Sequence, residues 1–171
     1  MLNKIKKFSF EKRIKKYLLQ RNNSDNNSKL VNIGFLVDED AFPNLENLYS
    51  LSEAFGIQRN DIKIFSFKKL DTSAPALNQN AVSQKDFTFN GSIKNDIAND
   101  FLDIEFDVLV GYYKEEHLYL DLMVAQSNAI FKVGLEGTDA RLFDLTLAIK
   151  PRDEDVFAIE MVKYLNALQK I

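Results

Sequence analysis

The sequence predicts an α/β fold: a single three-layer sandwich with a mostly parallel sheet of five or six strands, Rossmann-like or flavodoxin-like, preceded by a basic N-terminal helix. Two observations support this prediction. Short apolar runs typical of buried strands alternate along the chain with segments of helical periodicity, which indicates a parallel sheet covered by helices on both faces. The chain also has 171 residues, 46% of them hydrophobic, which suits one domain with an ordinary core.

The N-terminal helix is predicted to be amphipathic and to begin near Ser9, a candidate N-cap. One stripe of this helix carries four apolar residues at helical spacing: Phe10, Ile14, Tyr17 and Leu18. Three earlier apolar residues fall on the opposite side, and we expect them to form a separate turn or a disordered tip: Leu2, Ile5 and Phe8. The polar stretch at 22–28 predicts a linker, so we divide the chain into a basic helix with its linker at 1–28 and an α/β domain at 29–171.

The first half of the domain shows two strands with a helix between them. Apolar runs at 31–37 and 62–67 predict the strands. Pro43 is well placed as the first residue of the helix, which Gly56 is expected to end. Residues 70–84 show no periodicity and predict a long loop.

The second half continues the alternation up to a C-terminal helix. Its clearest buried strand lies at 107–113, with the sequence DVLVGYY. The helix at 116–127 is apolar on most faces, so we expect its neighbours to cover it. The remaining elements are a short strand at 86–90, a short helix near 93–101, strands at 130–135 and 144–149, and a helix after Pro151.

Charge is divided unevenly along the chain, and this is its strongest indication of a partner. Eight of the 22 basic residues lie in the first 21 positions with one acid, Glu11, so this basic arm carries about +7. The rest of the chain is acidic, which argues against a nucleic-acid surface spread over the domain. The bases of the arm are Lys4, Lys6, Lys7, Lys12, Arg13, Lys15, Lys16 and Arg21.

Three interpretations of the basic arm are open. In the first, the apolar stripe packs on the domain and the charges are simply solvated. In the second, the arm binds an anionic membrane surface, where each Lys or Arg contributes about 1 kcal/mol. In the third, the arm binds RNA or a protein partner, since phosphate contacts require only clustered positive charge.

Composition excludes several kinds of chemistry. The chain has no cysteine, so disulfides, thiol catalysis and cysteine-bound metal centres are excluded, and a reducing cytoplasm is the expected location. His117 is the only histidine, which rules out metal sites built from several histidines. The longest apolar run of the basic arm, at 17–19, is too short for a secretory signal, and no stretch reaches the ~20 apolar residues of a membrane span.

Candidate ligand-binding residues follow the predicted strands, because open α/β sheets bind ligands at the carboxyl ends of their strands. After the first strand come Asp38 and Asp40, which resemble the acidic corner that holds Mg²⁺ in response-regulator receivers. The strand at 107–113 ends in two tyrosines where those receivers carry a phospho-accepting aspartate. We therefore interpret the acids as a solvated turn ahead of the next helix.

Two further candidates lie after the strand at 107–113 or at its end. His117 stands beside an acid, and its ordinary pKa of about 6.5 suits a general base. A lone histidine in the first turn of a helix is more often structural, and no nucleophile pairs with it in the sequence. Tyr112 is placed to stack on a ligand.

Glu136 is the last candidate, and its surroundings argue against a phosphate site. It lies between Gly134 and Gly137, whose spacing fits neither a dinucleotide-binding nor a P-loop pattern. Glu136 and Asp139 would also repel a phosphate, with only Arg141 to counter them. No cofactor and no metal site are predicted.

Five blocks of the sequence resemble a family of small bacterial proteins classed as a domain of unknown function. The blocks are VNIGFLVDEDAF at 31–42, FDVLVGYY at 106–113, NAIFKVGLEG at 128–137, LFDLTLAI at 142–149 and VFAIEMVKYLNAL at 156–168. The resemblance extends over nearly the whole chain, including the basic arm. It implies no activity and assigns no functional residue.

A fainter similarity is to the N-terminal half of heptosyltransferase-like glycosyltransferases. In those proteins a DLVIDL strand precedes a strand that ends in RVG, much as 107–110 precedes 129–134 here, with Lys132 at the place of the basic residue. We expect no second Rossmann-like domain of the kind that holds the sugar nucleotide in those proteins. The similarity therefore implies the architecture alone.

These features predict a non-catalytic cytoplasmic α/β domain that binds a partner, with the basic arm as its candidate contact to a protein or an anionic surface. The alternative is a small enzyme or ligand-binding protein, a glycosyltransferase-like half domain, with its pocket at the carboxyl ends of the strands. The residues of that pocket would be Asp38, Asp40, Tyr112, His117 and Glu136.

Overall fold

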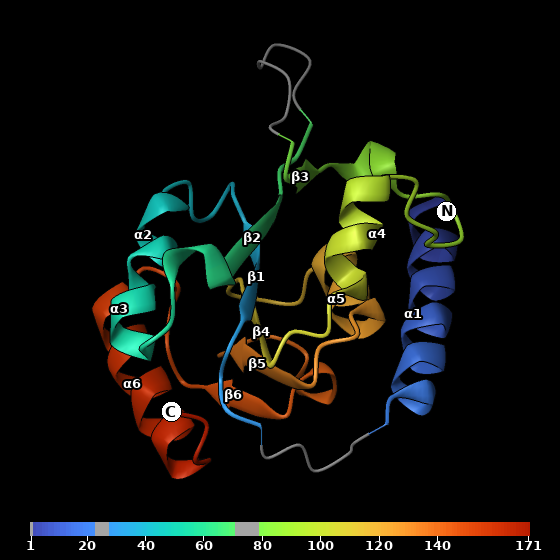
Figure 1. Cartoon of the computed structure of the whole chain (residues 1–171). Coiled ribbons are helices and arrows are strands. Elements are labelled where there is room, and N and C mark those ends of the chain that lie inside the picture. The colour runs from blue at the N-terminus through green and yellow to red at the C-terminus, as the bar shows by residue number, and fades with distance from the viewer. Residues whose placement is uncertain (1, 23–27, 71–78) are drawn as a thin grey trace.

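Six parallel strands form one sheet in the part of the chain that the structure describes. The computed structural model describes residues 2–22, 28–70 and 79–171, and the sheet runs through its centre (Figure 1). The strands are β1 Ile33–Asp38, β2 Ile62–Phe67, β3 Ala81–Val82, β4 Val108–Tyr112, β5 Phe131–Leu135 and β6 Leu145–Leu147.

The order of the strands makes β1 and β4 neighbours at the middle of the sheet. The order is β3-β2-β1-β4-β5-β6, and each of these pairings is parallel. The chain thus builds the sheet outward from β1 in one direction and then from β4 in the other. In doubly wound sheets of this order, ligands bind outside the carboxyl ends of the strands where the direction reverses, which here is between β1 and β4.

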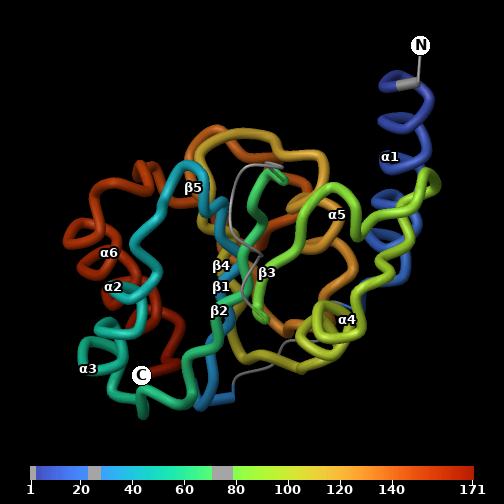
Figure 2. Tube along the Cα trace, turned by 90° about the horizontal axis from the view of Figure 1, so that it is seen from above, coloured from blue at the N-terminus to red at the C-terminus, as the bar shows by residue number. Residues whose placement is uncertain are grey.

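Helices cover both faces of the sheet, which confirms the predicted α/β fold and its N-terminal helix. Helices α2, α3 and α6 lie on one face and α4 and α5 on the other, while α1 packs on the outer side of α5 and adds a further layer (Figure 2). The helices are α1 Leu2–Gln20, α2 Glu46–Tyr49, α3 Leu51–Phe55, α4 Asp96–Asp103, α5 Leu118–Gln126 and α6 Glu154–Ala167.

The sheet separates two hydrophobic cores. Phe35 and Phe157 pack in the core beneath α2, α3 and α6, whereas Leu36 and Leu109 pack in the core beneath α4 and α5. All four side chains are fully buried. Phe35 and Leu36 are neighbours on β1 and enter different cores because successive residues of a strand point to opposite faces of the sheet. A strand that is buried on both faces reads as an unbroken apolar run, so the sequence located β1, β2, β4 and β5 to within two residues.

Two glycines on neighbouring strands make room for one aromatic ring. A Cβ atom on Gly134 of β5 would lie 2.5 Å from ring atom Cδ2 of Phe143, and one on Gly111 of β4 would lie 2.8 Å from Cζ of the same ring. Both distances are far below van der Waals contact. The ring of Phe143 can therefore lie flat against the sheet only because both positions are glycine.

The N-terminal helix is longer than the sequence predicted. Helix α1 begins at Leu2, so Ser9 lies within it and the predicted N-cap is wrong. Ile5 and Phe8 belong to the same helix instead of a separate turn, and their side chains are 50% and 70% exposed. The segment contains neither Gly nor Pro, so nothing in it interrupts a helix.

The predicted strand at 86–90 is wrong. Gln84–Asp86 form a 3₁₀ turn, and only an isolated antiparallel bridge joins Phe87 to Ile93. Phe87 is buried while Phe89 is 47% exposed, so these rings do not share one covered face.

The helix expected from Pro43 begins at Glu46 and is divided at Ser50 into α2 and α3. Gly56 ends α3 in the left-handed conformation, with φ of 70°, as predicted. Near the C-terminus, Leu165 of α6 Glu154–Ala167 is buried, whereas Leu168 lies just beyond the helix and is exposed.

Two predicted polar segments fall largely outside the described residues. These are the loop at 70–84, of which 71–78 is not described, and the linker at 22–28, of which 23–27 is not described. The described end of the loop contains β3, which pairs with the last two residues of β2. A two-residue strand is too short to produce a periodic pattern, so the sequence did not indicate it.

Phe10 fastens α1 to the rest of the molecule. Its side chain is fully buried, and its ring centroid lies 6.2 Å from that of Phe87 and 5.7 Å from that of Tyr119 on α5. Tyr119 in turn stacks on Phe67 at the end of β2, with 4.9 Å between centroids. Ile14, one helical turn after Phe10, is also buried. Aromatic contacts thus run without interruption from α1 to the sheet.

Polar contacts hold both ends of α1. Near its start, Lys6 donates a hydrogen bond from Nζ to the hydroxyl of Tyr119 at 3.0 Å. Just after its end, Arg21 donates to both carboxylate oxygens of Asp144 at 2.6 and 3.0 Å, and to the carbonyl of Ile130 at 3.3 Å. A bidentate ion pair of this kind adds geometric specificity to its attraction. The helix is therefore docked, as the first of the three interpretations expected.

Replacing Phe10 by alanine should destabilise the protein strongly, whereas replacing Phe8 should not. Phe10 is fully buried and Phe8 is 70% exposed on the same helix. We expect Phe10→Ala to lower the free energy of unfolding by about 3–5 kcal/mol and Phe8→Ala to change it by less than about 0.5 kcal/mol. Urea denaturation of both variants tests this, and equal effects would contradict the docked helix.

Gly134→Ala should also destabilise the protein, by about 1–3 kcal/mol, because the added methyl group would overlap the Phe143 ring. Phe143→Ala removes the whole ring, including the three atoms that a Cβ on Gly134 would meet. We therefore expect the double variant to lose less stability than the sum of the two single variants. Thermal denaturation of all four proteins gives the coupling, and simple additivity would show that the ring does not occupy this slot.

Candidate functional site

The loops that follow β1, β4, β5 and β6 surround a hollow of about 760 Å³ at the carboxyl edge of the sheet. This is the edge at which doubly wound sheets bind ligands, and the volume lies within the range of small-molecule sites. We call it the carboxyl-edge hollow. Its charged lining residues are Asp40, Lys114, Glu136, Lys150 and Arg152.

Two of the predicted site residues, Asp40 and Glu136, line the carboxyl-edge hollow. Asp38 is the last residue of β1, and its carboxylate accepts the backbone N–H of Asp40 at 3.2 Å, which shapes the turn. The carboxylate of Asp40 in turn accepts the backbone N–H of Lys69 at 2.8 Å, which links the loops after β1 and β2. The acids thus order the edge of the sheet, as the solvated-turn interpretation expects.

Tyr112 lies beneath the hollow instead of in it. Its side chain is fully buried among Phe35, Phe42 and Phe157, and its hydroxyl donates to the carbonyl of Pro151 at 2.5 Å. Burial raises the pKa of this hydroxyl well above its ordinary value, and the nearby acidic charges add to the effect. Tyr112 therefore cannot stack on a ligand, and it anchors the loop after β6.

His117 caps helix α5. Its Nδ1 atom accepts the backbone N–H of Leu120 at 3.1 Å, and its ring lies edge-on to Phe67 with 4.7 Å between centroids. Burial lowers the pKa of the imidazole, and the negative charges of Asp38 and Asp40 oppose this effect. Because Nδ1 accepts this hydrogen bond, the neutral ring carries its proton on Nε2, and its one basic lone pair is engaged in the helix cap. This agrees with the structural interpretation of the residue.

Sequence reasoning missed three basic residues that line the carboxyl-edge hollow: Lys114, Lys150 and Arg152. All three are exposed, and none has an ion-pair partner among the described residues. The available signal was their position, directly after the strands at 107–113 and 144–149. The sequence argument against a phosphate site rested on glycine spacing and on charges close to Glu136 along the chain. It did not include bases that other loops bring to the same edge of the sheet.

The expected repulsion of phosphate by Asp139 is removed in the structure. Arg141 donates to both carboxylate oxygens of Asp139, with Nη2 at 2.6 Å from Oδ2, and it also contacts Glu11 of α1 at 3.4 Å. The Arg141 guanidinium holds the pKa of Asp139 below its ordinary value, so the pair remains ionised. Asp139 and Arg141 therefore neutralise each other beside the hollow.

A buried carboxylate lies behind the helix cap, outside the predicted set. Asp121 accepts the hydroxyl of Tyr113 at 2.6 Å and the backbone N–H of His117 at 2.9 Å. Burial raises the pKa of Asp121 to about 6, although both hydrogen bonds act in the opposite direction. Because Asp121 and Tyr113 are almost fully buried, this pair is part of the fold and is closed to a substrate.

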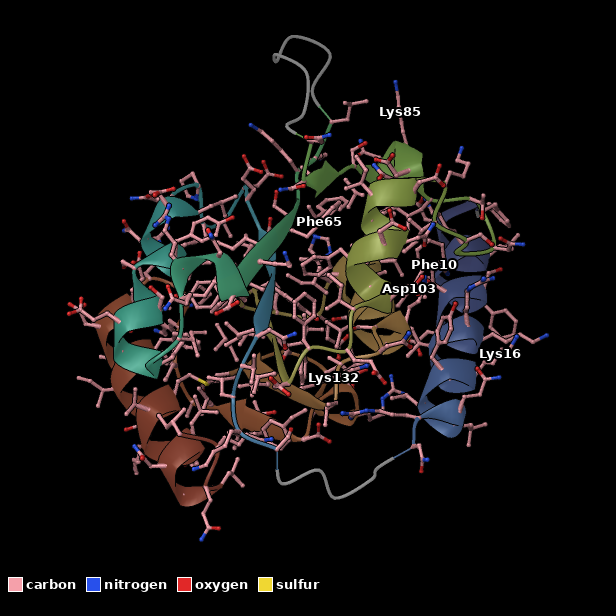
Figure 3. All side chains as sticks on the ribbon, viewed as in Figure 1. Phe10, Lys16, Phe65, Lys85, Asp103 and Lys132 are labelled. Carbon is pink, nitrogen blue, oxygen red and sulfur yellow. The ribbon has the colours of Figure 1, made fainter. Side chains whose placement is uncertain are left out.

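Lys132 of β5 carries a buried amine. Its side chain points into the molecule (Figure 3), is 1% exposed, and donates from Nζ to the carbonyl of Val124 at 2.6 Å. Burial lowers the pKa of this amine to about 7; the charge of Arg21 adds to the effect and that of Asp144 opposes it. Lys132 therefore does not offer its charge to a ligand.

The outward side of α1 is a second candidate surface. At 100° per residue, seven residues fall on the side opposite Phe10, and all of them are exposed. Three are apolar, with exposed fractions of 50%, 70% and 88% for Ile5, Phe8 and Leu19. We call this surface the outer face of α1; its members are Lys4, Ile5, Phe8, Lys12, Lys15, Lys16 and Leu19.

The outer face contains no acid, since the only acid of α1, Glu11, lies on its flank and contacts Arg141. Beside Phe8 a hollow of about 570 Å³ separates the helix from the turn at Asn90. Three bases of α1 line this hollow: Lys12, Arg13 and Lys16.

The described residues form neither a metal-binding cluster nor a membrane-spanning helix. Among the described residues, no group of three or more His, Asp or Glu side chains is arranged to hold a metal ion. Within the same residues, no helix is both long enough and apolar enough to cross a bilayer.

Comparison with known proteins identifies the family. The family of unknown function DUF6913 matches residues 6–168, which is nearly the whole chain, so the chain belongs to this family. The match includes most of α1 and all of the sheet, as the resemblance of the sequence blocks implied. No curated protein and no solved structure matches the chain.

The stability of the protein should rise with pH above neutrality because of Lys132. The Lys132 amine has a pKa of 10.5 in the unfolded chain and of about 7 in the folded protein. Between pH 7 and pH 10.5 the unfolded state therefore binds more protons than the folded state, and the free energy of unfolding rises with pH. We expect Lys132→Met to gain stability relative to the wild type at pH 7 and to lose about 3 kcal/mol of that advantage by about pH 9.5. Urea denaturation across this range tests it.

The exposed Lys94 supplies the control for this experiment. The Lys94→Met variant should differ from the wild type by the same amount at every pH in the window. A stability difference between Lys132→Met and the wild type that does not vary with pH would mean that the amine is charged in the folded protein.

Proposed function

We propose that this member of the DUF6913 family is a non-catalytic binding domain that associates reversibly with an anionic membrane surface through the outer face of α1. The observation that carries the proposal is the composition of this face, in which three large exposed apolar side chains alternate with four lysines and no acid. The leaflet that faces the cytoplasm carries the complementary negative charge, so the proposal includes a cytoplasmic location.

The combination of apolar and basic side chains favours a lipid bilayer over a nucleic acid. Phosphates of RNA require only cationic contacts, and although Phe8 could stack on a base, Ile5 and Leu19 would remain in water. At a bilayer interface, lysines reach the headgroup phosphates while apolar side chains enter the boundary with the acyl chains. Phe8 and Leu19 are eleven residues apart on the same line of the face, about 16 Å along the axis, so both enter when the helix lies flat on the surface.

The docking of α1 supports the same proposal. Phe10 and Ile14 occupy the inner side of the helix, so the outer face cannot turn inward and hide its apolar residues. The hollow beside Phe8, with Lys12 and Lys16 on its rim, gives a headgroup phosphate a place next to an inserting ring. Because α1 is already folded, its backbone loses no conformational entropy by folding when it binds a surface.

The expected strength of association is moderate. Four lysines near a negatively charged surface contribute about 4 kcal/mol in total, or roughly a thousandfold in affinity. Three apolar side chains add to this value but insert only to a shallow depth. The protein is therefore expected to bind the membrane reversibly and to leave it at high salt.

A binding role also agrees with what the candidate catalytic residues do. His117 uses Nδ1 to cap α5, and Tyr112 uses its hydroxyl to hold the Pro151 carbonyl. Asp38 and Asp40 accept backbone N–H groups in the loops of the carboxyl edge. These hydrogen bonds explain the four residues as parts of the fold, without assigning them a reaction.

Cosedimentation with vesicles tests the proposal. We expect the full chain to bind vesicles of phosphatidylcholine mixed with phosphatidylglycerol, and not vesicles of phosphatidylcholine alone. A variant with all four outer-face lysines changed to glutamine should lose binding by about a thousandfold. A second variant with Ile5, Phe8 and Leu19 changed to serine keeps the charge and should bind at least about tenfold more weakly than the wild type.

The matched control removes the same number of charges elsewhere. It replaces four exposed lysines outside α1 by glutamine, and it should bind as the wild type does: Lys29, Lys63, Lys85 and Lys94. Melting temperatures show that each variant is folded. Vesicle binding that depends on the lysines but not on the apolar residues would contradict the insertion of Ile5, Phe8 and Leu19 into the bilayer. Failure to bind anionic vesicles would contradict the membrane proposal.

A further inference from the structure

We propose that the carboxyl-edge hollow binds a phosphorylated small molecule that also carries hydroxyl groups, such as a sugar phosphate or a nucleotide. This inference is independent of the membrane association, because the hollow is formed by loops of the sheet and contains no residue of α1. It rests on three unpaired bases that converge from two loops, and on the two acids that share their rim.

The charges are ordered along the edge of the sheet. Following the strands from β1 to β4, β5 and β6, the lining residues are Asp40, Lys114, Glu136, and then Lys150 with Arg152. Positive charge is thus concentrated at the β6 end. A phosphate bound there would lie beside Lys150 and Arg152, and Glu136 of β5 would separate it from Lys114 of β4.

The arginine and the lysines suit a phosphate in different ways. The guanidinium of Arg152 can donate two parallel hydrogen bonds to phosphate oxygens, while lysine ammonium groups act as compact charges. Two other bases near this edge are committed elsewhere: Arg141 pairs with Asp139, and Lys68 lies 3.8 Å from Glu39. Within the described residues, the three bases of the hollow have no such partner.

The two acids favour hydroxyl groups on the ligand. A bare inorganic anion would leave Asp40 and Glu136 facing negative charge. A ligand with hydroxyl groups resolves this conflict, because a carboxylate accepts hydrogen bonds from hydroxyls and an acid in this role binds ribose in other doubly wound sheets. The mixed lining therefore indicates a ligand that carries both an anionic group and hydroxyl groups.

Two local constraints build the rim of the hollow. The buried hydroxyl of Tyr112 holds the carbonyl of Pro151 at 2.5 Å, which fixes the loop that carries Lys150 and Arg152. On the other side, Gly137 has φ of 90°, and a Cβ atom there would lie 2.5 Å from the carbonyl oxygen of Lys114. Only glycine allows these two loops to close so tightly.

Calorimetric titration of the full chain at constant ionic strength tests the proposal, with three probes at up to about 10 mM: ADP, ribose 5-phosphate and inorganic pyrophosphate. We expect ADP or ribose 5-phosphate to bind more tightly than pyrophosphate. Changing Lys150 and Arg152 to glutamine should weaken binding of every probe by at least about tenfold, because each loss removes a charge-assisted hydrogen bond. The matched control changes Lys85 and Lys94 to glutamine and should leave binding unchanged.

A second pair of substitutions tests the acids. Asp40→Asn with Glu136→Gln should strengthen the binding of pyrophosphate and weaken that of ribose 5-phosphate, which separates selection of hydroxyls from general charge. A preference for ADP over ribose 5-phosphate would identify a nucleotide as the source of the phosphate, and the reverse a sugar phosphate. Absence of binding by all three probes, or binding that the Lys150 and Arg152 changes do not affect, would overturn the proposal.

Discussion

The burial of Phe10 between Phe87 and Tyr119 is the interaction on which the arrangement of this molecule depends. Tyr119 belongs to α5 and stacks on Phe67 at the end of β2, so one aromatic cluster joins α1, α5 and the sheet. This contact fixes the rotation of α1 about its axis. Once Phe10 faces inward, Phe8 and Leu19 must face solvent together with the lysines between them, which gives the helix its basic and apolar outer face.

The same molecule uses its bases in two different ways. Arg21 and Arg141 bind Asp144 and Asp139 and connect α1 to the loops around β5 and β6. The bases of the outer face and of the carboxyl-edge hollow have no ion-pair partner among the described residues. Those of the outer face stand among apolar side chains, whereas those of the hollow stand among acids. Charge that is paired within the fold stabilises it, and charge left unpaired is available for recognition.

The sequence was sufficient for the framework and insufficient for the site. Strands buried on both faces, such as β2 and β4, appear as apolar runs, and Gly56 ends α3 as its position predicted. A pocket at the carboxyl ends of the strands was predicted as the alternative, and Asp40 and Glu136 line the hollow found there. Its bases were missed because they come from loops that are distant in sequence and meet only through the strand order. His117 and Tyr112 were plausible as reactive groups until the structure showed their hydrogen bonds to backbone. The N-cap was misplaced at Ser9 because Ile5 and Phe8 lie on the outer face of α1 and so do not continue the buried stripe of Phe10 and Ile14.

Native-state hydrogen exchange of the α1 amides tests the central claim most directly, because it measures how firmly the helix is held in the intact chain. If the aromatic cluster docks α1 as described, the amides between Phe10 and Tyr17 will exchange only through global unfolding, with the same free energy of opening as those of β4. Exchange of these amides at a much lower free energy of opening would mean that α1 detaches on its own, and the outer face would then have no fixed orientation.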